Sequence, residues 1–515
     1  MQKVINEVLE SSFKYFKAGN KKHRKEKGQF STPYKVAEFM ADLFVTKKKK
    51  IYILDPGAGS GILTTAIIQK AIEKNLANEI FVDLFEIDEQ LLLILGKNLE
   101  LLKKYCIEKN IKLEYKIYNC NFLLYYQDMW EKKEHEKYDI VIANPPYKRI
   151  NNTSLEVVFM KSIVHGQSNL YFLFLAMAIN LLKADGELVF LVPRSFFSGK
   201  HFQKFRQWML QRVFIEQIHH FKSRNKTFSG DILQEVVIIK LTKIDTANIL
   251  ITSSEGSDDL EFSKTLQVNK ELIISRNEHA HIKLPTSSEE VKLIELFELW
   301  DCRLDNFGVK FSTGPVVDFR RKQFISDCNI DEAIPLIWAH NFEDIYIDWP
   351  KEMSKFAQYI VQNEYTRSML LPNKNYILIK RCTSKEAKRR IKVNVLMKAH
   401  YEYDMIGIEN HINYLNYNGE INTDLFKGLY VLLNSNYYDK YYRIINGNIQ
   451  VNAYELNNLP FPDLNAIKKI GSCVLKIDDL CSDQCDKIMK EVLFKIPISV
   501  SDIKYQSVLK CGNRK

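Results

Sequence analysis

The chain has 515 residues, 46% of them hydrophobic, and a formal net charge of +10. This length allows two or three domains with packed cores. No apolar run approaches the ~20 residues of a membrane-spanning helix, and residues 1–22 are polar and amphipathic, unlike a signal peptide. We therefore expect a cytoplasmic protein with no membrane partner. The positive charge favours a polyanionic partner without distinguishing DNA from RNA.

The cysteines indicate neither a disulfide framework nor a metal centre. They lack close, paired spacing, and Cys481 with Cys485 form one CxxxC that has no second ligand pair nearby. We expect ordinary thiols in a reducing compartment and no bound metal.

Residues 51 to about 241 have the pattern of an α/β domain. Short β-rich runs alternate there with apolar helical stretches, which predicts a mostly parallel, Rossmann-like sheet covered by helices. The expected strands are Ile51–Leu54, Ile80–Phe85, Lys112–Tyr118, Tyr138–Ala143, Glu187–Val192, Phe214–His219 and Glu235–Leu241. The expected helices are Ile62–Glu73, Asp88–Lys104 and Asn169–Leu182, preceded by one in which Val36, Phe39, Met40 and Leu43 fall at helical spacing.

The alternation weakens after residue 245. The polar tract 252–259 indicates a loop, so we expect a catalytic domain over residues 1–245 and a linker region over residues 246–300. Residues 301–515 are rich in Asn, Tyr, Lys and Arg, which favours an α+β domain with a surface suited to nucleic acid.

A glycine-rich turn follows the first expected strand. The residues Asp55-Pro56-Gly57-Ala58-Gly59-Ser60-Gly61 lead into a helix, and such a turn lets the backbone approach a ligand closely. A dinucleotide fingerprint requires G-x-G-x-x-G, whereas these glycines follow an acidic residue as G-A-G-S-G. The pattern fits the amino-acid end of S-adenosylmethionine better, and a generic tight turn is the alternative.

Two further strand ends carry residues suited to a nucleoside. Glu86 ends the second strand, where a carboxylate can accept hydrogen bonds from ribose hydroxyls. Asn121 and Phe122 follow the third strand and can offer an amide and an aromatic ring to adenine, although Phe122 can equally be a core residue.

The fourth strand runs into Asn144-Pro145-Pro146-Tyr147, beside the glycine turn in a doubly wound sheet. A conjugated amine is a poor nucleophile because its lone pair is delocalised. The Asn144 side-chain oxygen and the Pro145 carbonyl can accept hydrogen bonds from such an amine and draw its lone pair toward a methyl sulfonium. The two prolines restrict the backbone, and Tyr147 can stack on a nucleobase that carries such an amine.

These segments, in this order, resemble the gamma class of amino-methylating DNA methyltransferases of type II restriction–modification systems. The resemblance rests on GQFSTP at 28–33, DPGAGSG at 55–61, Glu86, Asn121-Phe122, NPPY at 144–147 and VPRSFFSG at 192–199. It implies methyl transfer from S-adenosyl-L-methionine to adenine N6 in double-stranded DNA, with the base flipped out of the duplex. It also implies a separate restriction endonuclease as functional partner, and we expect a monomer.

The resemblance assigns roles to individual residues. Thr32, Asp55, Gly57, Gly59 and Glu86 would hold the cofactor, with Asn121 and Phe122 at its adenine. Asn144, Pro145, Pro146 and Tyr147 would bind the target amine. The family commonly has Asp where this chain has Asn121, so we expect weaker or different cofactor binding.

One more aromatic residue and the C-terminal half also match the family. Phe228, in the segment TFSG, would contact the opposite face of the flipped base, and a loop aromatic packed in the core is its alternative. Residues 446–453 and 456–462 resemble the end of the target-recognition region. The basic residues that follow the expected strand Tyr376–Lys380 can contact phosphate or guanine, or form a solvated face: Arg381, Lys385, Lys388, Arg389 and Arg390.

Other functions share parts of this pattern. Enzymes that methylate protein glutamine or RNA adenine also have NPPY, but the long C-terminal region and the early GQFSTP favour DNA. Methylation of cytosine N4 usually has Ser in place of the first Asn. A specificity subunit with an inactive fold would not need intact catalytic positions, and we find no nuclease centre of clustered carboxylates with a Lys.

Overall fold

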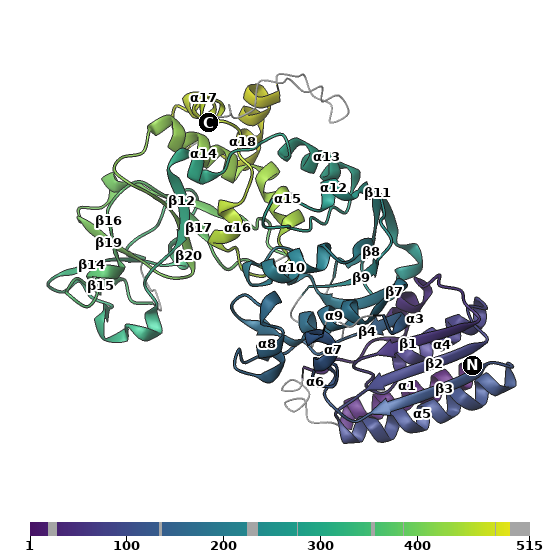
Figure 1. The fold of residues 1–515 in the computed structure, drawn as a ribbon. Coiled ribbons are helices and arrows are strands. Elements are labelled where there is room, and N and C mark those ends of the chain that lie inside the picture. The colour runs from purple at the N-terminus through teal and green to yellow at the C-terminus, as the bar shows by residue number, and fades with distance from the viewer. Residues whose placement is uncertain are drawn as a thin grey trace. The chain divides into compact units, whose positions relative to one another are not determined.

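The computed structural model describes residues 1–18, 28–132, 136–223, 235–275, 277–351, 356–384, 386–478 and 480–494. The chain divides into two compact units, Met1–Ser287 and Ser288–Lys515 (Figure 1). Within the described ranges, no helix is both long and apolar enough to cross a membrane. The same ranges contain no cluster of three or more His, Cys, Asp or Glu side chains arranged to hold a metal ion.

The first unit is built on a nine-stranded sheet with the order β11-β10-β8-β9-β7-β4-β1-β2-β3. Its strands are β1 (Lys50–Asp55), β2 (Glu79–Phe85), β3 (Lys112–Tyr118), β4 (Tyr138–Ala143), β7 (Leu182–Pro193), β8 (Phe214–Phe221), β9 (Val236–Thr242), β10 (Asn248–Ser254) and β11 (Lys264–Asn269). β1 pairs in parallel with β2 and with β4, and β4 pairs in parallel with β7. β9 lies antiparallel between β7 and β8. This order extends the doubly wound arrangement by an inserted antiparallel strand, and it confirms the predicted α/β, Rossmann-like class.

Helices cover both faces of this sheet. The longer ones are α1 (Gln2–Ala18), α3 (Tyr34–Asp42), α4 (Ile62–Glu73), α5 (Glu89–Glu108), α9 (Leu170–Leu181) and α10 (Gln203–Leu210). Alternate strand residues such as Ile51, Ile53, Ile140 and Ile142 share one buried cluster with residues of α3, α4 and α5. α9 is buried along almost its whole length, because it is apolar on every side and packs on β7.

Short elements connect these layers. They are α6 (Phe122–Tyr125), α7 (Gln127–Glu131), α8 (Leu155–Phe159), α12 (Lys270–Ile273), β5 (Arg149–Ile150) and β6 (Ser168–Asn169). The predicted strands and helices are all present, with ends displaced by a few residues, and the predicted helix before the first strand is α3.

The expectation of a linker over residues 246–300 is wrong for the part that contains β10 and β11. β10 pairs in parallel with β8, and β11 pairs antiparallel with β10, so both strands belong to the sheet. The polar end of β10 is buried because its hydroxyls have partners on the neighbouring strand. His219 Nδ1 lies 2.8 Å from Thr252 Oγ1, and His219 Nε2 lies 3.1 Å from Ser254 Oγ. Because buried polar groups of this kind are satisfied by hydrogen bonds, a strand can have the polar composition that we interpreted as a loop.

The second unit combines two sheets with helices, as the predicted α+β class requires. One sheet has the order β12-β20-β17-β18 and the other β13-β15-β14-β19-β16. The strands are β12 (Val309–Thr313), β13 (Ile325–Ser326), β14 (Ala333–Ile337), β15 (Tyr359–Val361), β16 (Leu370–Pro372), β17 (Tyr376–Lys380), β18 (Val393–Leu396), β19 (Met405–Ile408) and β20 (Ile412–Tyr417). The helices are α13 (Ser288–Phe297), α14 (Thr423–Asn434), α15 (Asn436–Ile445), α16 (Ala453–Asn457), α17 (Leu464–Ser472) and α18 (Ser482–Met489).

Candidate active site

The strand order places two of the predicted loops side by side. The chain proceeds from β1 to β2 and β3 on one side and returns to β4 on the other, so the order reverses between β1 and β4. Ligands of doubly wound sheets bind outside the carboxyl ends of the strands at such a point. Leu54 of β1 is paired with Val141 of β4, so the turn after Asp55 and the loop from Asn144 leave the same edge. A Cβ on Gly57 would lie 3.9 Å from the Asn144 carbonyl oxygen.

Asp55 is a buried carboxylate with one unused oxygen. The Thr64 hydroxyl donates to Asp55 Oδ2 over 2.7 Å, whereas Oδ1 is buried and has no hydrogen-bond partner among the described residues. Burial raises the pKa of Asp55 to about 7, against the opposing effects of the Thr64 hydroxyl and the Gly57 backbone amide. A buried acceptor without a partner is costly, so Oδ1 marks a position where a ligand donor would be favourable.

Glu86 holds the glycine turn against the end of β2. Its Oε2 accepts from the Gly59 amide over 2.9 Å, and its Oε1 accepts from the Ile87 and Asp88 amides over 2.8 Å each. Burial raises the pKa of this carboxyl, and the three amides oppose the shift. A carboxylate has about four acceptor positions, so three bonds leave little capacity for the expected pair of ribose hydroxyls.

The turn has supporting residues that no motif marks. Ser12 of α1 donates to the Ser60 hydroxyl over 2.6 Å, and Asn98 of α5 donates to the Ser60 carbonyl over 2.8 Å. The Tyr15 hydroxyl donates to Asp88 Oδ2 over 3.2 Å. Residues 1–18, expected only to be polar and amphipathic, therefore form a helix that contacts the site. The amphipathic pattern of these residues is the sequence feature that could have indicated this helix.

Gly61 gives a testable stability effect at this turn. It adopts φ +87°, and a Cβ there would lie 2.9 Å from Leu95 Cδ1. A side chain in the left-handed region costs about 1–2 kcal/mol, so Gly61→Ala should lower the free energy of unfolding by about that amount in urea titrations. Gly96→Ala is the matched control, because Gly96 lies in α5, an added Cβ there would meet no atom outside its own helix backbone within 4 Å, and stability should be unchanged or slightly raised. Equal stability of the two variants would contradict the strain at Gly61.

The structure gives Asn121 and Phe122 mainly structural roles. Asn121 caps α6: its Oδ1 accepts from the Leu123 and Leu124 amides over 3.0 and 3.3 Å, and its Nδ2 donates to Glu156 over 2.8 Å. Both lone pairs of the expected adenine acceptor are thereby used. Phe122 is 2% exposed, and its ring lies edge-on to Phe85 at 5.2 Å. It packs in an aromatic cluster and presents no free face.

The Asn144 side chain is oriented by the segment that precedes α3. Asn144 Nδ2 donates to Thr32 Oγ1 over 3.0 Å and to the Phe30 carbonyl over 3.3 Å. Asn144 Oδ1 is buried and has no hydrogen-bond partner among the described residues. The predicted residues Thr32 and Asn144 thus contact each other directly.

The rest of the loop 144–147 is held by further contacts. The Tyr147 hydroxyl donates to the Leu191 carbonyl over 3.0 Å, and its ring centre lies 5.5 Å from that of Phe30. Burial raises the pKa of Tyr147 well above its usual value, so the phenol stays neutral. Pro145 is buried and Pro146 half-buried. Within the described residues, the Pro145 carbonyl accepts no hydrogen bond, and a carbonyl and an amide oxygen are therefore both available next to the glycine turn.

Several predicted contacts lie elsewhere. Phe228 and Lys385 lie outside the described residues. Arg390 is 3% exposed, and its guanidinium donates to the Ile449 carbonyl over 3.1 Å and to Asn446 Oδ1 over 3.2 Å. Arg389 donates to the Ser435 carbonyl over 3.0 Å. The expectation that Arg390 contacts nucleic acid is therefore wrong, because its donors are used inside the second unit.

The segment 446–458 forms a buried polar network. Tyr442 and Asn446 donate to Glu455 Oε2 over 2.8 and 2.6 Å. Asn457 exchanges two hydrogen bonds with the Phe311 backbone of β12, at 2.7 and 2.9 Å. The segment that resembles the end of the family's target-recognition region therefore packs α15 and α16 against each other and connects α16 to the four-stranded sheet by hydrogen bonds.

Comparisons with known proteins agree with this architecture. Residues 63–228 match the family model of the Eco57I restriction-modification methylase. The chain is 35% identical to the type II methyltransferase M.BsuBI of Bacillus subtilis over 478 residues, which are 92% of this chain and 95% of that one. It is also 35% identical to the type II methyltransferase M.PstI of Providencia stuartii over 456 residues, 88% and 90% of the two chains. Among solved structures, the type IIL restriction-modification enzyme MmeI in complex with DNA aligns with a TM-score of 0.52 at 14% identity, covering 96% of this chain and 75% of that one.

The sheet order and the two loops at its reversal point define a Rossmann-like methyltransferase fold. The likeness to M.BsuBI and M.PstI covers nearly the whole of each chain. The chain therefore belongs to the methyltransferases of type II restriction–modification systems.

Proposed function

We propose that this protein transfers a methyl group from S-adenosyl-L-methionine to adenine N6 at a specific sequence of double-stranded DNA, and so protects that DNA from a separate restriction endonuclease. The observation that carries the proposal is Asn144 Oδ1, a buried acceptor without a partner beside the glycine turn. An amine placed at this oxygen would supply the missing donor.

The geometry suits an exocyclic amine. Adenine N6 has two hydrogens, and the Asn144 Oδ1 and Pro145 carbonyl oxygens can accept one each. Accepting both draws the nitrogen lone pair out of conjugation and toward an electrophile. No strong base is required, because the amine becomes acidic as the methyl group arrives. Positioning and hydrogen bonding therefore make the dominant contributions.

The residues at the end of β1 fit the amino-acid end of the cofactor. The unused Asp55 Oδ1 can accept from an ammonium group, and Gly57 and Gly59 leave the backbone open to close approach. When bound, S-adenosyl-L-methionine supplies an electrophilic methyl on a sulfonium. Asp55 and the glycine turn bind and orient it, and Glu86 keeps the turn in place.

A target base must leave the duplex to reach this loop. Flipping costs about a few kcal/mol, which stacking and hydrogen bonds to the base edge offset. The Tyr147 ring is held at both ends, by its backbone and by the Leu191 carbonyl, so it can support a base without losing conformational freedom. Phe228 is the proposed contact on the other face of the base.

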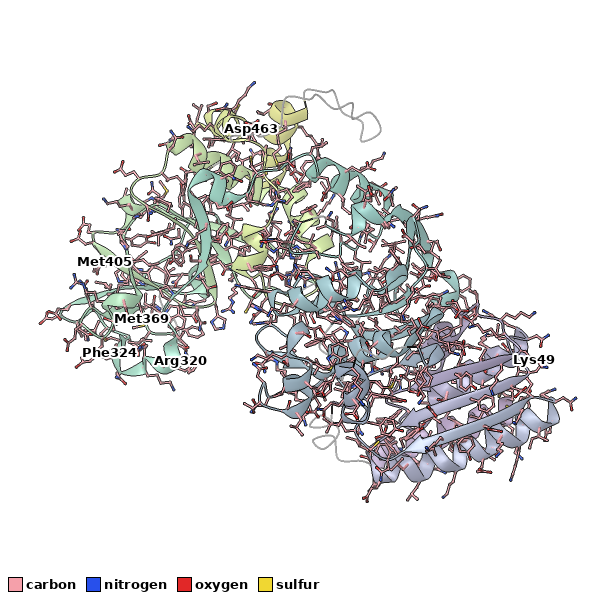
Figure 2. All side chains as sticks on the ribbon, in the orientation of Figure 1. Lys49, Arg320, Phe324, Met369, Met405 and Asp463 are labelled. Carbon is pink, nitrogen blue, oxygen red and sulfur yellow. The ribbon has the colours of Figure 1, made fainter. Side chains whose placement is uncertain are left out.

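We assign DNA recognition to the second unit. Part of its surface forms a basic-aromatic patch made of Phe319, Arg320, Lys322, Phe324 and Tyr365; Arg320 and Phe324 are labelled in Figure 2. Phe319 and Tyr365 are each 63% exposed. The Arg320 guanidinium lies 5.4 Å from the Phe319 ring centre, and the Phe324 and Tyr365 rings stack at 5.9 Å. Exposed cations beside aromatic faces are suited to phosphates and bases.

Neutralising this patch should weaken DNA binding in a salt-dependent way. In Arg320→Gln/Lys322→Gln, the slope of log affinity against log salt should fall in magnitude by about two, because each phosphate contact contributes about one. Fluorescence anisotropy with a duplex at increasing salt measures the slope. Lys47→Gln/Lys49→Gln is the matched control, since both lysines are exposed at the amino end of β1, away from the site edge. Equal slopes in both double variants would remove the patch from the DNA interface.

The reaction itself is tested with purified protein, methyl-labelled S-adenosyl-L-methionine and duplex DNA. Digestion to nucleosides followed by mass spectrometry should place the label on N6-methyldeoxyadenosine, and Asn144→Ala should lower the initial rate of labelling by at least ~100-fold. Label on cytosine N4 would replace adenine as the substrate. Label accepted only by RNA or protein would overturn the proposal.

A further inference from the structure

We propose that Thr32 is a positioning residue for Asn144. Together with the Phe30 carbonyl, it sets which end of the Asn144 amide faces the target amine. This inference rests on the proposed function. It adds to the cofactor contact that the sequence resemblance implied for Thr32, because a hydroxyl that accepts from Asn144 can still donate to a ligand.

The contacts determine the orientation of the amide. An asparagine side chain can turn over by 180°, which exchanges its donor and acceptor ends. The Phe30 carbonyl can only accept, so the end of Asn144 that faces it, at 3.3 Å, must be the NH2 group. The second hydrogen of that group is accepted by Thr32 Oγ1 at 3.0 Å. Both hydrogens of the Asn144 NH2 group are then used. Oδ1, at the other end of the amide, has no hydrogen-bond partner among the described residues.

The orientation matters for catalysis because the target also carries an NH2 group. With Oδ1 outward, Asn144 accepts from the amine. Turned over, it would present a donor to a donor and could not draw out the lone pair. Thr32 is 6% exposed, so water does not readily replace its hydroxyl as the acceptor.

The segment that carries Thr32 is itself fixed to the catalytic loop. The Gly28 carbonyl accepts from the Tyr147 amide over 3.2 Å. Gly28 adopts φ +68°, and a Cβ there would lie 3.0 Å from Lys148 Cβ. The Phe30 ring packs on Tyr147. Residues 28–32 therefore hold both ends of the Asn144–Tyr147 loop, and α3 begins directly after them at Tyr34.

Thr32→Val tests this role, because it keeps the shape of the side chain and removes the acceptor. The single-turnover methylation rate at saturating DNA and cofactor should fall about 10-fold, consistent with the loss of one hydrogen bond. Calorimetry measures the cofactor Kd separately, so that a change in cofactor binding is not read as a change in the rate. Thr32→Ser should restore the rate to within about 2-fold, since it retains the hydroxyl. Thr265→Val is the matched control, because Thr265 is exposed on the edge strand β11, outside the segments assigned to the site, and it should behave like the wild type.

A double-variant cycle separates positioning from a general structural effect. Thr32→Val should slow Asn144→Ala no further, because Thr32 acts through the Asn144 amide. An unchanged rate at saturating cofactor, whatever the cofactor Kd, would overturn the inference. A further slowing of Asn144→Ala by Thr32→Val would overturn it too. A wild-type protein that methylates no DNA would instead refute the proposed function, so the two failures are distinguishable.

Discussion

Asn144→Ala is expected to reduce the single-turnover methylation rate by at least ~100-fold while leaving the cofactor Kd nearly unchanged. The large effect follows from the position of Asn144 Oδ1, a buried acceptor that can stabilise charge developing on the target amine. The cofactor Kd should be spared because Asn144 Nδ2 donates to Thr32 and Phe30, and the cofactor is assigned to the turn after Asp55. Rapid-quench kinetics and calorimetry measure the two quantities.

Asn6→Ala is a suitable control for this experiment. Asn6 is exposed on α1, and among the described residues its side chain accepts a hydrogen bond only from Gln2 in the same helix, so both quantities should match the wild type. If Asn144→Ala lost cofactor affinity and methylation to the same extent, Asn144 would be part of the cofactor site and its assigned role would be wrong.

The second large effect is expected at Asp55. Its pKa of about 7 means that its ionisation changes near neutral pH. An ammonium group is attracted by the ionised carboxylate, so cofactor affinity should fall as the pH drops below about 7, by up to about tenfold per pH unit. At high pH the cofactor's amine loses its own proton, with a reference pKa of about 7.7–8.0. The affinity should therefore pass through a maximum between these values.

Asp55→Asn separates these two effects. It should weaken cofactor binding at least about 10-fold at neutral pH, because a hydrogen bond to a charged group is lost, and it should remove the acid limb of the pH profile. The alkaline limb should remain, since it belongs to the cofactor. Isothermal titration calorimetry from pH 5.5 to 9 covers both limbs. An acid limb that persists in Asp55→Asn would assign that titration to another group.

Much of the first unit could be predicted because local pattern and tertiary structure agree there. Strands such as β1 and β4 are fully or largely buried apolar runs that end at turn residues, and the two loops that follow must meet where the strand order reverses. The proximity of the Asp55 turn to Asn144 therefore follows from topology.

Other features depend on contacts that no local pattern encodes. The polar end of β10 has the composition of a loop. It is nevertheless a buried strand, because His219 on a neighbouring strand provides hydrogen-bond partners for its hydroxyls. Asn121 is placed correctly at the end of β3, but whether its oxygen faces a ligand or caps α6 depends on the backbone of the next residues. Similarly, the basic character of Arg390 does not reveal that its donors bind the loop around Asn446.

The most direct test of the proposed function is single-molecule sequencing of genomic DNA from a methylation-deficient host that expresses the protein, compared with the same host expressing Asn144→Ala. We predict N6-methyladenine at one short sequence motif throughout the genome with the wild-type protein, and none with the variant. A genome without N6-methyladenine, while the protein is soluble and binds its cofactor, would contradict the assignment of duplex DNA adenine as the substrate.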